Sequence, residues 1–77
     1  MTTIIYELTE NGDGNKIAEY TLSPKNALVC FIMQSRNNFN TWDYPEEIKG
    51  MRQSRTVPNH WYFDDIVNKR VLAAYPA

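Results

Sequence analysis

The segment "SPKNALVCFIMQSRNN" constrains the fold most, because its uninterrupted apolar run from Ala27 to Met33 has to be buried. The spacing of the apolar residues does not by itself separate a helix from a buried strand. The flanking residues favour a helix, since Ser23 is a good N-cap, Pro24 suits the first helical position and a pair of asparagines supplies an exit. We therefore predict a helix from about Pro24 to Arg36.

Apolar residues cover more than one side of this predicted helix. One stripe is expected to pack on a sheet: Ala27, Leu28, Phe31 and Ile32. Three more residues widen the apolar surface around the axis: Val29, Cys30 and Met33. A single sheet cannot cover so wide a surface, so we expect a further covering segment or a second copy of the chain.

The segment before the helix predicts a β-hairpin. Two β-prone runs in "TTIIYELTENGDGNKIAEYTLS" flank a cluster of Gly, Asn and Asp residues, which adopt positive φ at low cost. Alternation places two apolar sets where we expect the core. These sets are Ile4, Tyr6 and Leu8 in the first strand and Ala18, Tyr20 and Leu22 in the second.

The last part of the chain predicts two more strands, roughly Asn59 to Phe63 and Arg70 to Tyr75, joined across a polar cluster. Pro58 and Pro76 bracket the pair, as expected for residues without an amide hydrogen. The resulting order is strand, strand, helix, strand, strand. We predict a single α+β domain over residues 1–77, with one antiparallel sheet packed on one main helix.

An irregular aromatic loop is expected between the helix and the second pair of strands. In "FNTWDYPEEIKGMRQSR" the breakers are Pro45 and Gly50, and one helical turn is predicted around Glu46 to Met51. Phe39 and Trp42 have two interpretations. They either cover the exposed side of the helix as part of the core, or they belong to a binding surface.

Composition excludes several classes of protein. The single cysteine, Cys30, rules out an intramolecular disulfide and a zinc site built from cysteines, and its apolar surroundings indicate a small buried residue. The formal charge of -1 favours neither a cationic nor an anionic partner. A signal region is not visible and the longest apolar run is far shorter than the about 20 residues of a membrane span, so a cytoplasmic protein is expected.

Motifs for metal binding or catalysis are weak. "NGDGNK" resembles the start of a calcium loop, but Lys16 stands where such loops need glycine and Leu22 where they need glutamate. His60 could share a strand face with Tyr62 and Asp64, yet no nucleophile or metal motif accompanies it. The adjacent carboxylates at 46–47 and 64–65 are explained by solvation and capping. We predict no metal, no cofactor and no enzymatic activity.

Recognition of a partner is the remaining function, because aromatic and charged residues are interleaved after residue 38. We predict a non-catalytic module that binds another protein. The residues expected to contact that partner are Trp42, Tyr44, Glu46, Glu47, Lys49, Arg52, Arg55, Trp61 and Tyr62. Size and composition are analogous to those of phage or plasmid proteins that inhibit or assist a host enzyme, such as a defence nuclease.

Two alternatives stay open at the level of sequence. The aromatic and basic segment 39–62 could bind RNA or single-stranded DNA, because bases stack on rings and phosphates attract cations. The chain could instead be a structural homodimer, because apolar residues lie on several sides of the predicted helix. Binding to a membrane is not expected.

Overall fold

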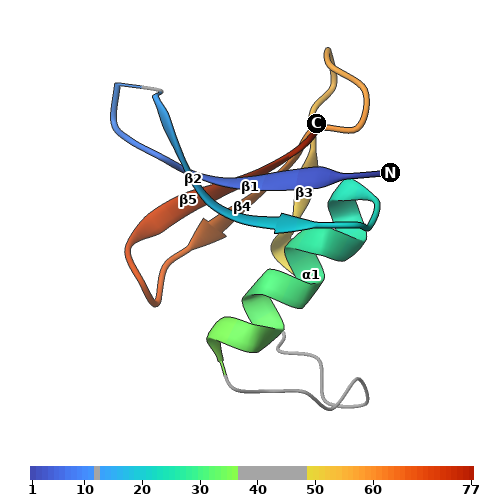
Figure 1. Ribbon diagram of the computed structural model, residues 1–77. Coiled ribbons are helices and arrows are strands. Elements are labelled where there is room, and N and C mark those ends of the chain that lie inside the picture. Colours follow the sequence, from blue (N-terminus) through green and yellow to red (C-terminus); the bar gives the residue numbers. More distant parts are fainter. Residues whose placement is uncertain (12, 37–48) are drawn as a thin grey trace.

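One five-stranded antiparallel sheet, with a helix packed on one of its faces, is formed by residues 1–11, 13–36 and 49–77, the part of the chain that the computed structural model describes (Figure 1). The strands lie in the order β2-β1-β5-β4-β3. Their bounds are β1 Thr3–Leu8, β2 Gly14–Tyr20, β3 Arg52–Gln53, β4 Trp61–Asp65 and β5 Arg70–Pro76, and the helix α1 spans Pro24–Ser35. The predicted α+β class and the order of the two hairpins around one helix are confirmed.

Sequence reasoning missed one strand and one pairing. The two-residue strand β3 pairs with β4 at the edge of the sheet, and it lies in the segment that we expected to be irregular. The first and last strands, β1 and β5, are neighbours at the centre of the sheet, where they pair along the full length of β1. This long-range pairing joins the two hairpins into one sheet.

The helix begins and ends close to the predicted residues. The carbonyl oxygen of Ser23 accepts a hydrogen bond of 2.8 Å from the amide of Ala27, and Pro24 occupies the first turn, although the Ser23 hydroxyl makes no capping bond. Arg36 is the C-cap. No helix in the described ranges is both long and apolar enough to cross a membrane.

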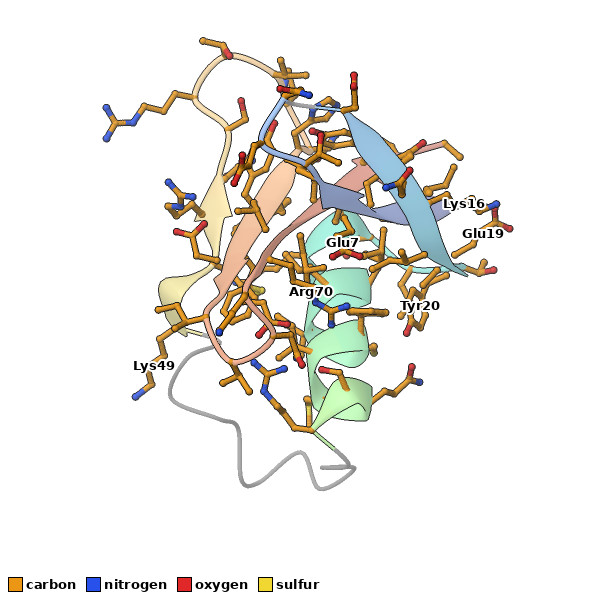
Figure 2. The ribbon with its side chains drawn as sticks, turned by 90° about the vertical axis from the view of Figure 1, so that its left-hand side faces the viewer. Glu7, Lys16, Glu19, Tyr20, Lys49 and Arg70 are labelled. Atoms are coloured by element: carbon orange, nitrogen blue, oxygen red, sulfur yellow. The ribbon has the colours of Figure 1, made fainter. Side chains whose placement is uncertain are left out.

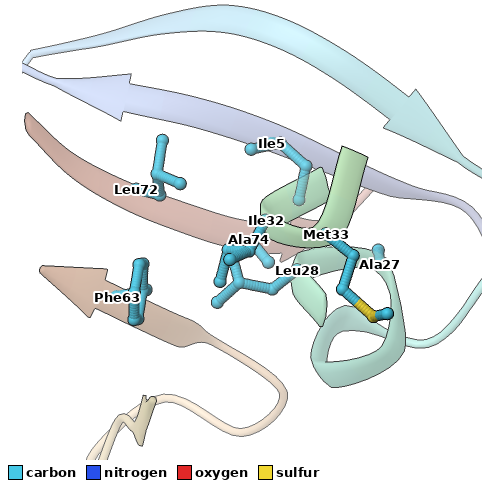
Figure 3. Packing of buried hydrophobic residues seen from close by; sticks show 8 residues of the cluster. All are labelled: Ile5, Ala27, Leu28, Ile32, Met33, Phe63, Leu72 and Ala74. Atoms are coloured by element: carbon cyan, nitrogen blue, oxygen red, sulfur yellow. The ribbon is translucent and has the colours of Figure 1, made fainter. Parts of the chain in front are cut away.

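The core lies between α1 and the sheet (Figure 3). Its buried apolar members are Ile5, Ala27, Leu28, Ile32, Met33, Phe63, Leu72 and Ala74. Two side-chain hydrogen bonds close its margin. The Thr3 hydroxyl donates to the Leu22 carbonyl at 2.7 Å, and the Tyr20 hydroxyl donates to Gln34 of α1 at 2.6 Å.

The predicted core face of the first strand was wrong by one residue. Thr3 and Ile5 face the helix and are fully buried, whereas Ile4 and Tyr6 are only half-buried on the other side. Thr3 tolerates burial because its hydroxyl is hydrogen-bonded, as burial of a polar group requires. The register shift of β1 against β2 leaves Ile17 as an extra residue, a β-bulge next to Ala18.

Ile5 and Ile4 give a matched test of this register. We expect Ile5→Ala to lower the free energy of unfolding by about 3 kcal/mol, because it leaves a cavity in the core. Ile4→Ala removes the same atoms from the half-buried face and should cost less than about half as much. Urea denaturation of both variants measures the difference, and equal costs would contradict the observed register.

Candidate functional site: an aromatic face of the sheet

The face of the sheet that points away from α1 carries a cluster of aromatic rings. Alternation along a strand places the neighbours of the core residues Ile5, Phe63 and Ala74 on this opposite face. The name tyrosine face is used here for four half-buried residues: Tyr6 of β1, His60 immediately before β4, Tyr62 of β4 and Tyr75 of β5. Three different strands therefore contribute to one surface.

Tyr75 is the centre of the tyrosine face. Its ring stacks on His60 with centroids 4.1 Å apart and an interplanar angle of 28°. Tyr6 lies tilted against it at 5.4 Å, and Tyr62 meets it edge to face at 6.0 Å. Such pairs contribute about 0.5–1.5 kcal/mol each beyond their buried area, so the four rings hold one another in place.

Two small residues make room for these rings. Ala73 lies opposite Tyr6 on one side and opposite Tyr62 on the other, and it is fully buried. Gly14 of β2 is close to Tyr6, since a Cβ atom at Gly14 would lie 3.3 Å from the Tyr6 Cβ and Cδ1 atoms. Larger side chains at these two positions would force the tyrosine rings to move.

One ion pair lies at each of two edges of the tyrosine face. At one edge, Arg52 of β3 lies 3.2 Å from Asp64, and both side chains are more than half exposed. At the other edge, Lys16 and Glu19 of β2 are 3.1 Å apart (Figure 2). Exposed pairs of this kind add little stability, but they give the surface balanced charge beside its aromatic centre.

The hydroxyl of Tyr75 is held in its neutral form. Burial raises its pKa to about 12, assisted by its hydrogen bond of 3.5 Å to the Tyr62 hydroxyl and by the charges that Tyr62 and Tyr6 would acquire on ionisation. At neutral pH this residue therefore offers a partner an apolar ring and a neutral hydroxyl. It does not supply a phenolate nucleophile or base.

The raised pKa of Tyr75 predicts a loss of stability in alkali. The unfolded state ionises first, near pH 10, so the stability present below that pH is lost as pH rises toward about 12. Tyr75→Phe keeps the ring and removes the ionisable group. We expect the variant to lose up to about 2 kcal/mol less than the parent between these pH values in chemical denaturation, whereas parallel pH profiles would contradict the assignment.

Asp65, at the end of β4, is the centre of a second group of interacting side chains, and the pKa of its carboxyl is shifted. The side chain is fully buried and bridges Arg36 at the end of α1, at 2.7 Å, with Arg70 at the start of β5, at 2.9 Å. Asn68, in the turn between β4 and β5, donates through its side-chain nitrogen at 3.0 Å and its backbone amide at 3.4 Å. The name Asp65 cluster is used here for these four residues.

The chemistry of the Asp65 cluster is structural. Burial opposes ionisation of Asp65, but hydrogen bonds from Arg36, Asn68 and Arg70 outweigh it and lower the pKa to about 2. The carboxylate is charged at neutral pH and both of its oxygens are occupied. Perturbed pKa values mark structural ion pairs as well as active sites, and this inaccessible group belongs to the first kind.

Asp65→Asn tests this role, because the amide keeps the shape and removes the charge that two arginines need. We expect a loss of roughly 3 kcal/mol at neutral pH, as for other buried pairs that lose one partner. The lowered pKa adds about 2 kcal/mol of parental stability that is present above about pH 4 and lost as pH falls toward 2. The difference between parent and variant in urea denaturation should therefore narrow over that range. A difference that does not change with pH would contradict the charge assignment.

The structure brings together two of the predicted partner-binding residues. Arg52 and Tyr62 are paired across β3 and β4 beside the tyrosine face. Trp61 lies on the other side of the sheet, packed against the core with the ammonium of Lys25 5.4 Å from its ring centroid. Lys49 and Arg55 are exposed, and Lys49 extends outward in Figure 2.

Other predicted features lie outside the described residues. They are Phe39, Trp42, Tyr44, Glu46 and Glu47. Of the helical turn predicted over residues 46–51, residues 49–51 are described; Lys49 and Gly50 have 3₁₀ geometry and Met51 has no regular secondary structure. The question of whether Phe39 and Trp42 belong to the core or to a surface stays a prediction.

Sequence reasoning missed Tyr6 and Tyr75 as members of one surface. Their positions were expected to be core and strand end, and only the β1–β5 pairing brings them side by side. The local signal was the alternation of Tyr62 with core residue Phe63, which places Tyr62 outward. The partner strand that carries Tyr75 completes the cluster.

Neither a metal-binding group nor a similar protein indicates a function for this surface. Within residues 1–11, 13–36 and 49–77, no group of three His, Cys, Asp or Glu side chains could hold a metal ion. A scan against protein-family models and searches of curated proteins and of solved structures found no match for this chain. A function for this protein must therefore be argued from its own geometry.

Proposed function

We propose that this protein is a non-catalytic domain that binds another protein through its tyrosine face. The observation that supports this most directly is the cluster of Tyr6, His60, Tyr62 and Tyr75 on a sheet face that α1 does not cover. A core needs only one face of the sheet, and that face is filled by other residues. Aromatic rings on the second face have no role in packing against the helix.

The physical chemistry of tyrosine suits such a surface. A tyrosine ring supplies a large contact area with few rotatable bonds, and its hydroxyl adds a directed hydrogen bond. Here the rings already hold one another through Tyr75, so binding would cost little additional side-chain entropy. Apolar neighbours on the same face, Ile4 and Val71, would extend the contact.

Charge distribution favours a protein over a nucleic acid. Each edge of the tyrosine face carries one cation and one anion, in the pairs Arg52–Asp64 and Lys16–Glu19. A nucleic-acid surface needs an excess of cations to replace the counterions of the phosphates. A mixed rim is instead typical of protein interfaces, where charges of both signs surround an aromatic centre.

The domain would act by occupying a surface of its partner. The tyrosine face offers aromatic rings and the neutral hydroxyl of Tyr75, and the Asp65 cluster is closed by its own hydrogen bonds. An inhibitory or accessory role toward a host enzyme, and an origin in a phage or plasmid, stay predictions that depend on the identity of the partner.

Affinity capture with matched variants tests the proposal. The immobilised parent, Tyr62→Ala and Val57→Ala are exposed to lysate of the source cell, with and without nuclease. We expect the parent and Val57→Ala to retain the same protein with and without nuclease. Tyr62→Ala should retain at least about tenfold less of that protein, as for loss of an aromatic hot spot. Val57 is an exposed apolar residue in the loop before Pro58, so it controls for general stickiness.

Thermal unfolding of each variant separates binding from folding. Tyr62 is half-buried, so a modest decrease in melting temperature is expected and should leave the variant folded under the capture conditions. Equal retention of the protein by the parent and Tyr62→Ala would contradict the proposal.

Nucleic-acid binding is the second candidate, and one observation favours it. Arg52 is paired with Tyr62 across the β3–β4 ladder, and exposed Arg55 follows shortly after. Stacking of bases on the tyrosines with phosphates on these arginines would resemble other single-strand binding sheets. Capture that disappears with nuclease, together with oligonucleotide affinity that falls steeply with salt, would establish this candidate in place of the first.

A further inference from the structure

The turn between β4 and β5 exposes two aliphatic side chains next to each other. Ile66 is 84% exposed, the most of any large apolar side chain in the described ranges, and Val67 is 66% exposed, second only to Met1 among the others. Tight turns favour Gly, Asn, Asp, Ser and Pro, so turn geometry gives no reason for two β-branched aliphatic residues here. A requirement other than folding is needed to explain them.

The turn is also held rigidly. Asp65 accepts hydrogen bonds from the side chain and the backbone of Asn68, and the amide of Lys69 donates to the Ile66 carbonyl at 3.2 Å. Lys69 adopts a left-handed conformation with φ of 53° to complete the turn. Ile66 and Val67 are therefore presented from a fixed backbone, which lowers the entropic cost of contact with a partner.

An open depression of about 380 Å³ lies beside this turn, at the end of the sheet. Leu8 and Val71 contribute apolar side chains to it, and Ile66 stands at its margin. Five charged residues also line it, and three of them, Asp64, Asp65 and Arg70, are engaged in the ion pairs described above. The other two are Glu10 and Lys69. Glu10 follows β1 and Lys69 belongs to the turn, and neither forms an ion pair within the described part of the chain.

These features are self-complementary. The same end of the molecule carries a projecting aliphatic tip, a largely apolar hollow of side-chain size and, outside the ion pairs of the described chain, one anion, Glu10, and one cation, Lys69. In a dimer with a two-fold axis, the aliphatic tip of each copy can enter the hollow of the other. The anion of each copy can likewise meet the cation of the other, so every contact forms twice. A foreign partner would have to supply each of these complements separately.

We propose that two copies of this chain associate through this end of the sheet, with Ile66 and Val67 of each copy entering the depression of the other. Glu10 of one copy then lies opposite Lys69 of its partner, and the reverse pair forms across the axis. The interface is small and gives a weak, concentration-dependent dimer. The depression shares Asp64 and Val71 with the margin of the tyrosine face, but the residues changed in the tests below, Glu10, Ile66 and Lys69, are not members of that face. The inference can therefore fail or hold independently of the proposed function.

Charge reversal in two separate chains tests the geometry. In Glu10→Lys alone, and in Lys69→Glu alone, both intermolecular pairs become repulsive. We expect each single variant to dimerise at least about tenfold more weakly than the parent in sedimentation velocity. An equimolar mixture of the two variants restores both opposite-charge pairs, and it should form a heterodimer with close to parental affinity.

Further variants keep the test decisive if one of the mixed proteins is less stable. The double variant Glu10→Lys, Lys69→Glu should dimerise again, because both pairs are restored with exchanged signs. Ile66→Asp should be monomeric, while the matched change Val57→Asp, at another exposed apolar residue, should dimerise like the parent. Thermal unfolding confirms that each variant is folded.

The proposal is overturned by any of three results. They are a parent that stays monomeric up to high micromolar concentration, a mixture of the two charge variants that does not associate more strongly than either alone, and an Ile66→Asp variant that dimerises like the parent. The first result would leave the exposed turn to a different protein.

Discussion

The buried carboxylate of Asp65 is the interaction on which the arrangement of this protein depends. It joins the end of α1, through Arg36, to the start of β5, through Arg70, and it fixes the intervening turn through Asn68. A buried charge is tolerated only when its oxygens are satisfied, and here they are. The guanidinium of Arg70 also lies 5.2 Å from the ring centroid of Phe31 on α1, so the cluster and the hydrophobic core support each other.

This fixation sets how α1 lies on the sheet, and so which face of the sheet stays uncovered. A helix of Pro24–Ser35 fills one side with aliphatic residues, and the tyrosines occupy the other. An uncovered sheet face in a small domain is usually polar. The concentration of rings around Tyr75 departs from that pattern, and the departure is the physical basis for assigning a binding role to this face.

The sequence predicts much of the fold because its strongest signals are local. Ser23 and Pro24 mark the start of α1, and the cluster of Gly and Asn residues marks the first turn. The inward face of β1 was mispredicted because its inward residues include the polar Thr3, whereas the more apolar set, Ile4, Tyr6 and Leu8, lies on the other face. The β1–β5 pairing was not predicted, since it depends on contacts between the two ends of the chain.

The candidate site, too, was predicted where the signal is local and missed where it depends on long-range pairing. Tyr62 and Arg52 were predicted as surface residues from composition alone; Tyr62 belongs to the tyrosine face and Arg52 lies beside it. Tyr6 and Tyr75 could not be added to them without the sheet order, because nothing near either residue in the sequence indicates the other. Adjacent aromatics in a strand necessarily point to opposite faces, so Trp61 belongs to the core side once Tyr62 points outward.

Because Tyr62 and Trp61 point to opposite faces of the sheet, their signals test most directly the central claim that the face opposite α1 binds a protein. Side-chain NMR signals are recorded while the captured partner is added in steps to the isotopically labelled domain. Binding at the tyrosine face predicts that the ring signals of Tyr6, His60 and Tyr62 shift or broaden, while the indole signal of Trp61 changes little. Changes concentrated on Trp61 and on α1, with the signals of the tyrosine face unaltered, would contradict the account.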